Sequence, residues 1–265
     1  MIGARVDNFG VGAYGTDQAL IRFLLNDEVD IAPVVILAHY TTDIQRNICQ
    51  DFRHTHGISK RFGPTFKPRF VLDADGRLEM IPIPTIAPER YAEFMADPRE
   101  FLRHDDLAPG TPDGELRLRF PFSLTLLRAA LDPRFRARRL WGGPPYVDAY
   151  DPDHPTRALQ ITASILERFN EVALERGRRP LVVIIPTAWD CQNLAQNSRL
   201  NHASLLTELD QRGVPYLDLT PALVEAYGGT PPDSAYAGGD RTKHHSADGN
   251  ETITRIVLER LVHDG

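Results

Sequence analysis

Three short apolar runs limit the folds that this chain can adopt. They lie at Val34–Ala38, Leu181–Ile185 and Val214–Leu219, and each is bounded by a turn or by a helical pattern. Short runs of mostly β-branched and aliphatic residues are typical of strands buried on both faces, as in a parallel sheet. All three are far shorter than the roughly 20 residues that span a bilayer.

Helical periodicity fills the intervals between these runs. Apolar residues recur at helical spacing over Thr16–Leu25, Ala158–Leu174, Leu200–Leu209 and Thr252–Leu261. The first of these segments also begins with capping-type residues, Thr and Asp. Helices that alternate with buried strands predict an α/β fold with a mostly parallel sheet covered on both faces.

A segment of different character, over about residues 67–155, interrupts this alternation. It begins with an expected hairpin, in which Phe70–Leu72 and Leu78–Ile81 flank the turn Asp73–Gly76. The remainder is rich in proline, arginine and aromatic residues, and we expect it to lie over the top of the sheet, where α/β folds place substrate-shaping loops. Two stretches within it have a helical pattern, Pro88–Phe94 and Phe122–Leu131.

Composition favours a single globular domain over residues 1–265, because 42% of the chain is hydrophobic and 25% is charged. The net charge of −6 opposes binding to nucleic acid. Cys49 and Cys191 have no zinc or disulfide spacing, and Asp51, His54 and His56 lack a further ligand, so no metal site is expected. No secretory signal or membrane span is visible, which leaves the cytoplasm as the default compartment.

Three glycines before the first expected helix, Gly10, Gly12 and Gly15, have the G-x-G-x-x-G spacing of a dinucleotide fingerprint. The residues before them, 4–7, would make a poor central strand. No acidic residue follows the strand that ends at Ala38, where a ribose-binding carboxylate would stand. A tight structural turn therefore competes with nucleotide binding as the explanation of these glycines.

The same segment, Asn8–Gln18, resembles the second sequence block of the SGNH/GDSL serine hydrolases, Asn-x-Gly-Val-x-Gly-Tyr-Gly-Thr-Asp-Gln. The resemblance continues at Ala38–Asp43, in the place of the third block's Gly-x-Asn-Asp, and at Lys67–Phe70, which is similar to some bacterial members. It ends at His244–Asn250, which looks like the family's His-x-Ser-x-x-Gly-Asn block. These matches keep the family's order over nearly the whole chain.

The resemblance implies a flavodoxin-like three-layer sandwich and a serine ester hydrolase that needs no cofactor. Its substrate would be an acylated carbohydrate or another small ester. His244 would be the general base, because a serine hydroxyl needs a proton acceptor poised near neutral pH. Backbone N–H groups near Gly12 and Ala13 would bind the oxyanion, with Thr42 and Asp43 nearby.

Several positions depart from the family pattern. Ala13 stands in place of a glycine, and Thr41 and Thr42 stand in place of Gly and Asn. His245 competes with His244 as the motif histidine. The family's orienting Asp lies three residues before its histidine, where this chain has an arginine, so Asp240 is the nearest substitute.

The largest departure is that no Gly-Asp-Ser block occurs in the chain. We therefore expect an N-terminally truncated hydrolase, without the first strand and its nucleophile and without esterase activity of its own. Arg5–Phe9 would then be the second strand. Two alternatives stay open: a non-catalytic binding module of this fold, and a nucleotide-binding Rossmann-type protein. The basic run Arg134–Arg139 could grip an acidic substrate, although such runs are more often solvated helix faces.

Overall fold

A small parallel sheet lies at the centre of the protein. The computed structural model describes residues 5–26, 32–55, 63, 65–114, 120–131, 144–240 and 244–263. Strands β1 (Val34–Tyr40), β4 (Arg179–Ile185) and β5 (Tyr216–Asp218) pair in the order β1-β4-β5, all parallel. Tyr40 pairs with Ile185, so β1 and β4 end at the same level. The predicted α/β class with a mostly parallel sheet is confirmed.

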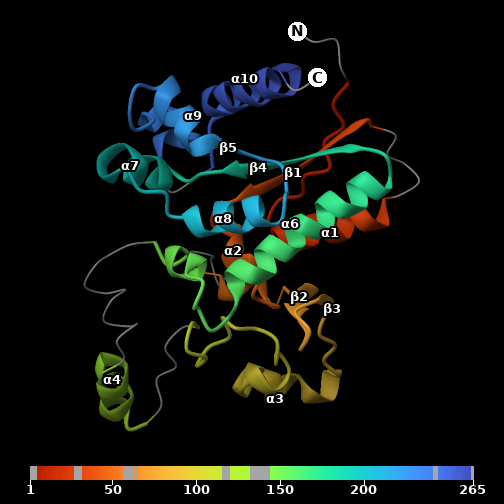
Figure 1. Cartoon of the computed structure of the whole chain (residues 1–265). Helices are drawn as coiled ribbons and strands as arrows, with labels where there is room; N and C mark the ends of the chain where they lie inside the picture. The colour runs from red at the N-terminus through yellow and green to blue at the C-terminus, as the bar shows by residue number, and fades with distance from the viewer. Residues whose placement is uncertain are drawn as a thin grey trace.

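Helices cover both faces of β4 (Figure 1), whereas the side of β1 that carries Ile36 and Ala38 is exposed, so the expected cover on both faces is incomplete. One face packs on α1 (Thr16–Leu25), α6 (Ala158–Glu175) and α8 (Ala203–Gln211). The other packs on α7 (Ala188–Asn197), α9 (Leu219–Ala226) and α10 (Ala247–His263). Alternate residues of β4 supply the two cores, because successive strand side chains point to opposite faces. The predicted helices at Thr16–Leu25 and Phe122–Leu131 have the observed bounds, and the other predicted helices differ by a few residues at their ends.

The predicted hairpin forms from β2 (Arg69–Leu72) and β3 (Leu78–Ile81), which pair antiparallel. The Asp73 carboxylate holds the turn by accepting hydrogen bonds from the N–H groups of Asp75 and Arg77. The hairpin packs on α6 and α1, on the outer side of that helical layer. The short elements are α2 (Asp43–Arg46), η1 (Phe52–His54), η2 (Pro88–Arg90), α3 (Tyr91–Ala96), η3 (Pro98–Glu100), α4 (Phe122–Leu131), η4 (Val147–Tyr150), η5 (Asp233–Ala235) and η6 (Ala237–Gly239).

Arg5–Phe9 does not form the predicted second strand. These residues are exposed and irregular. In the sequence Val6 is flanked by charged residues, which gives no apolar strand pattern, and the Asn8 side chain accepts a hydrogen bond from the Gly10 N–H. Within the described residues, β1 therefore pairs on one side only, with β4. Sequence periodicity missed α7 and α9, since the outer face of α7 is a run of polar residues and α9 is short with a proline in its first turn.

Arg69 ties the hairpin to the rest of the molecule from a buried position. Its Nη1 donates to the Ile48 carbonyl at 2.7 Å, to the His104 carbonyl, and to Asp106 Oδ2 at 3.0 Å. The Arg69 side chain is 2% exposed, and its loss would leave the carbonyl of buried Ile48 without its partner, whereas Asp106, with a side chain 36% exposed, keeps access to water.

We expect Arg69→Ala to lower the free energy of unfolding by about 1–3 kcal/mol, the usual cost of leaving a buried hydrogen-bonding group without a partner. Urea denaturation monitored by circular dichroism would measure the change. The matched control is Arg77→Ala, at a side chain that is 81% exposed, for which we expect a change below about 1 kcal/mol. Equal effects of the two substitutions would contradict this role for Arg69.

Candidate functional site

The carboxyl end of β1 gathers the residues on which the sequence analysis depends. The strand ends at Tyr40, and Thr41, Thr42 and α2 follow at once. The Tyr40 ring lies 5.2 Å from the His244 ring, centroid to centroid, although the two are about 200 positions apart in the chain. His244 therefore lies at the carboxyl edge of the sheet, as its expected role requires.

The structure distinguishes His244 from its neighbour. His244 is exposed, whereas His245 is buried, stacks on Tyr236 at 5.1 Å and bonds through Nε2 to the Pro186 carbonyl at 3.2 Å. Burial lowers the pKa of His245, the effect expected where the charged form loses its hydration. His245 is thus committed to packing, which leaves His244 as the histidine of this pair that is open to a ligand.

The rest of the His-x-Ser-x-x-Gly motif starts helix α10. Ser246 Oγ accepts from the Gly249 N–H at 3.2 Å and donates to the Ser234 carbonyl at 2.7 Å. Any side chain at Gly249 would meet the Ala235 carbonyl oxygen at 2.3 Å. The serine and the glycine therefore serve the local fold, and they fix the chain that carries His244.

Asp240 lies on the same connection, just after η6, and is half-buried. Residues 241–243, which join it to His244, are outside the described part of the chain, and Arg241 is among them. The role of Asp240 in orienting the histidine stays a prediction. The same is true of Arg134–Arg139, which the structure also does not describe.

The glycine-rich loop reaches the same edge of the sheet through α2. The Tyr14 carbonyl accepts from Arg46 Nη1 at 3.1 Å, and Gly15 lies so close to Arg46 that a Cβ there would be 2.8 Å from the Arg46 Cβ. Arg46 is the last residue of α2, which begins directly after Thr42, so the loop Gly12–Tyr14 is anchored to that helix, about one turn from Thr42.

Ala13 has a backbone conformation that normally requires glycine. The Tyr14 N–H donates to the Val11 carbonyl at 3.2 Å, and Ala13 occupies the third position of this turn with φ of 70°. The left-handed region is costly for a residue with a Cβ. Ala13 is exposed, and its N–H has no hydrogen-bond partner among the described residues, which suits a group that binds a ligand.

Asp43 is a buried carboxyl at this edge, 7% exposed. Arg46 Nη1 lies 2.9 Å from its Oδ1, although the N–H directions do not align for a hydrogen bond. Burial raises the pKa of Asp43 to about 7, against the opposing effect of Arg46, and the nearby Asp17 raises it further. Asp17 is itself buried and forms an ion pair with Lys67.

Sequence reasoning missed a buried network around Asp190. Its carboxylate accepts from Thr41 Oγ1 at 2.7 Å, Tyr146 OH at 2.9 Å and Asn201 Nδ2 at 2.7 Å, and from both the N–H and the hydroxyl of Thr187. The Thr41 hydroxyl is thereby used up, so of the two threonines only Thr42 can donate to a ligand. A signal was present, because Thr187 and Asp190 form a capping box at the start of α7.

His39 was also missed, and it joins the two loops of the site. Tyr150 OH donates to the Thr41 carbonyl at 2.8 Å, so it must accept from His39 Nε2 at 3.0 Å, and His39 Nδ1 then accepts from the Thr16 hydroxyl at 2.7 Å. Burial lowers the pKa of His39 to about 3, with nearby His202 adding to the effect, so the ring is neutral at ordinary pH.

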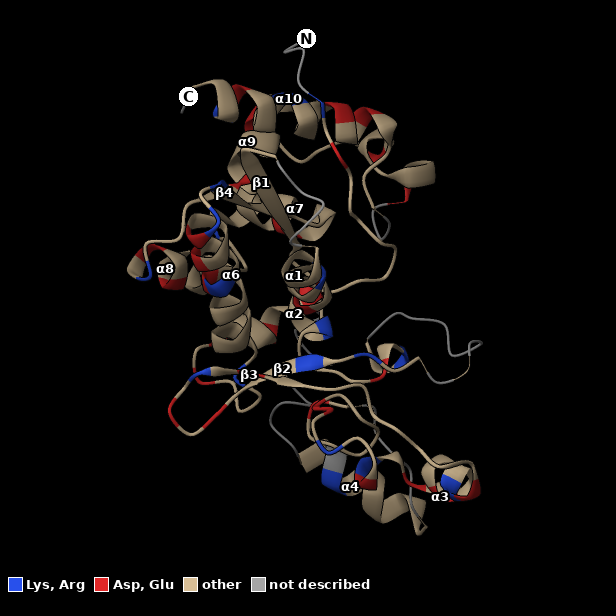
Figure 2. Cartoon of the chain, turned by 90° about the vertical axis from the view of Figure 1, so that its right-hand side faces the viewer, with Lys and Arg blue, Asp and Glu red and all other residues tan. Residues whose placement is uncertain are grey.

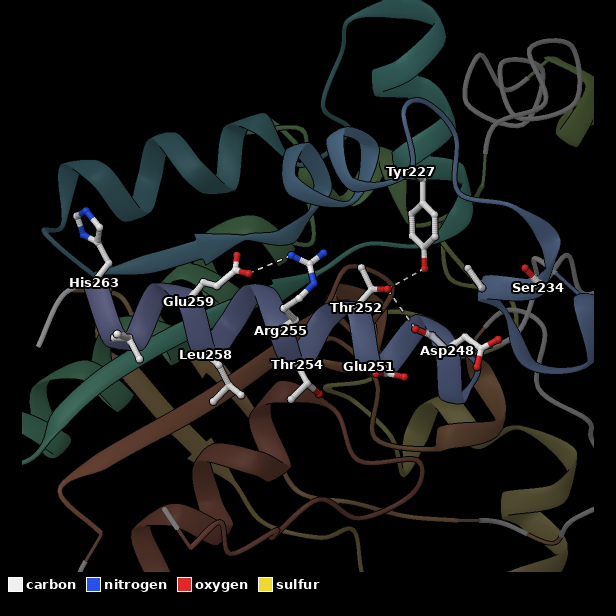
Figure 3. Close-up of a pocket in the computed structure, with 12 residues that line it drawn as sticks. Tyr227, Ser234, Asp248, Glu251, Thr252, Thr254, Arg255, Leu258, Glu259 and His263 are labelled. Carbon is white, nitrogen blue, oxygen red and sulfur yellow. Dashed lines mark hydrogen bonds and ion pairs between the residues drawn. The ribbon is translucent and has the colours of Figure 1, made fainter. Parts of the chain in front are cut away.

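A groove lies elsewhere, along the outer face of α10 (Figure 3). It has a volume of about 1190 Å³ and contains the Tyr227–Thr252 hydrogen bond and the Arg255–Glu259 ion pair. None of the predicted site residues lines it.

No group of three or more His, Cys, Asp or Glu side chains in the described part of the chain is placed to hold a metal ion. His54 bonds Asp105 at 2.9 Å, Asp51 pairs with Arg53, and His56 is not described.

We expect Ala13→Gly to raise the free energy of unfolding by about 0.5–1 kcal/mol, because relief of left-handed strain outweighs the added chain entropy of glycine. Ala19→Gly, within α1, is the matched control and should lower it by about 1 kcal/mol. Thermal unfolding of both variants gives the comparison. A loss at Ala13 equal to the loss at Ala19 would show that the turn is unstrained.

We expect the stability gained from Asp43→Asn to grow as pH rises from about 4 to about 7. In the folded protein the pKa of Asp43 is about 7, so the folded state holds a proton that the unfolded chain, with a pKa of about 3.9, has released. Stability contributed at low pH is therefore lost as pH rises, by at most about 1.4 kcal/mol per pH unit. Urea unfolding of both proteins across this range tests it, and a difference independent of pH would contradict the protonated carboxyl.

The structure thus brings His244, Tyr40, Thr42, Asp43 and the loop Gly12–Tyr14 to one edge of the sheet. Comparison of the chain with protein-family models, characterised proteins and solved structures found no match.

Proposed function

We propose that this chain carries the general base and the oxyanion-binding loop of an SGNH-type ester hydrolase. The observation that carries the proposal is the contact between His244 and Tyr40, which sets an exposed imidazole beside the end of β1. The carboxyl edge of a parallel sheet is where α/β folds bind ligands. The substrate would be an acyl ester of a carbohydrate or of another small molecule.

The chemistry assigns a task to each group. His244 takes the proton from the oxygen that attacks the ester carbonyl, and the Ala13 N–H and the Thr42 hydroxyl donate to the oxyanion that develops. In the SGNH family the attacking oxygen belongs to the serine of a Gly-Asp-Ser block, which is not in residues 1–265. This chain alone should therefore act only on an ester attacked by an added nucleophile.

A second candidate function is a binding module that keeps the fold without catalysis. The use of the Thr41 hydroxyl by Asp190 favours it, since one expected donor near the oxyanion is then withdrawn. Nucleotide binding is disfavoured by the start of α1. There the Asp17 N–H donates to Asn47 Oδ1 at 3.1 Å, and the Asp17 carboxylate lies in the first turn, where it would repel a phosphate.

Hydroxylamine supplied as an external nucleophile separates the hydrolase from the binding module. Its nitrogen attacks the acyl carbon of p-nitrophenyl acetate, p-nitrophenolate leaves, and His244 accepts the proton. We expect His244→Ala to slow this reaction at least about tenfold, a conservative value for a general base. Release of p-nitrophenolate, measured at 400 nm, gives the rate.

The matched control is His263→Ala, which removes another exposed histidine, on α10, and should leave the rate unchanged. Thr42→Val should slow the reaction by about two- to tenfold, the value of one hydrogen bond. If His244→Ala and His263→Ala react alike, the hydrolase proposal fails and the binding module stands.

A further inference from the structure

Helix α4 stands apart from the sheet and its helical layers (Figures 1 and 2). Large apolar side chains on it are exposed: Phe122 at 55%, Leu126 at 53%, Leu127 at 55% and Leu131 at 66%. Phe120, just before the helix, is 88% exposed. An exposed apolar surface of this kind on one element marks a place where something else binds.

Helix α4 lacks the burial pattern of an ordinary surface helix. Such a helix turns its apolar side chains to the core and its polar side chains to water. In α4 the polar Thr125 is only partly exposed, whereas Leu126 and Leu127 beside it are open. At 100° per residue, the apolar residues cover more than half of the helix circumference, with Ser123 among them, and Thr125 and Arg128 share the remaining face. Arg128 and Ser123 are exposed as well, so α4 is open on nearly all sides and its apolar side chains are left without cover.

The charge around α4 identifies what would cover this face. Residues 115–141 contain seven arginines and two acidic residues, a net charge of +5, whereas the whole chain carries −6. Of these arginines, only Arg128 lies in the described part of the chain. Apolar side chains next to arginines match the interface of a bilayer, where acyl chains lie beneath anionic headgroups.

We propose that α4 is a membrane-surface anchor that lies in the interface of a bilayer containing anionic lipid. The helix has 10 residues, about 15 Å, which is half of a hydrocarbon core, so it lies on the membrane. No helix in the described residues is long and apolar enough to span a bilayer. A symmetric contact between two copies through α4 is less favourable, since it would set the same basic segment against itself.

The test is cosedimentation of the 265-residue protein with vesicles of phosphatidylcholine containing about 30% phosphatidylglycerol, a composition with a negative surface potential. We expect binding to these vesicles and much weaker binding to pure phosphatidylcholine. The double substitution Leu126→Ser and Leu127→Ser should lower the partition coefficient at least about tenfold, because serine lacks the apolar side chain that each leucine would bury in the bilayer. Leu174→Ser, at a leucine of α6 that is 58% exposed, is the matched control and should bind like the original chain.

Circular dichroism would check that each variant is folded, as expected for substitutions of exposed residues. The proposal is overturned if the original chain binds neither vesicle, or if the double variant and the control bind alike. It is also overturned if light scattering shows a dimer that the double variant abolishes while vesicle binding persists, since α4 would then join two copies of the chain.

Discussion

The buried carboxylate of Asp190 is the interaction on which the carboxyl edge of the sheet depends. A carboxylate without access to water is costly unless several hydrogen-bond donors surround it. Here the donors are Thr41 after β1, Tyr146 at the start of η4 and Asn201 just before α8. Thr187, which follows β4 and caps α7, donates to the same carboxylate through its N–H and its hydroxyl. Because the donors come from distant parts of the chain, this one group fixes how the loops at this edge meet.

Two further buried polar groups connect the insertion to this edge. Lys67 pairs with Asp17 in the first turn of α1, and Arg69 caps carbonyl groups of the segment that follows α2. His39 extends the same logic, since it bridges Thr16 and Tyr150 in the neutral state that its burial enforces. Buried polar groups of this kind require specific partners, so they fix the start of α1, and with it the loop Gly12–Tyr14, against β1 and α2.

Local patterns predicted most of the fold. The apolar runs at β1 and β4 and the periodicity of α1 and α6 are strong, and their elements formed where the sequence placed them. The patterns failed where the signal was weak or absent: Arg5–Phe9 is irregular, and α7 is a largely polar helix stabilised by its cap and its buried face. For the site, motif order pointed to His244, but no pattern indicated that the Thr41 hydroxyl would donate its hydrogen bond to Asp190.

The sequence by itself determined the α/β class, the parallel sheet and the candidates for the base and the oxyanion loop, because these follow from periodicity and from residue chemistry along the chain. Only the tertiary structure decided which of two adjacent histidines is open and which is packed against Tyr236. It also decided that the leucines of α4 face outward. The physical reason is that burial and partnership depend on residues far away in the chain, and no local pattern contains that information.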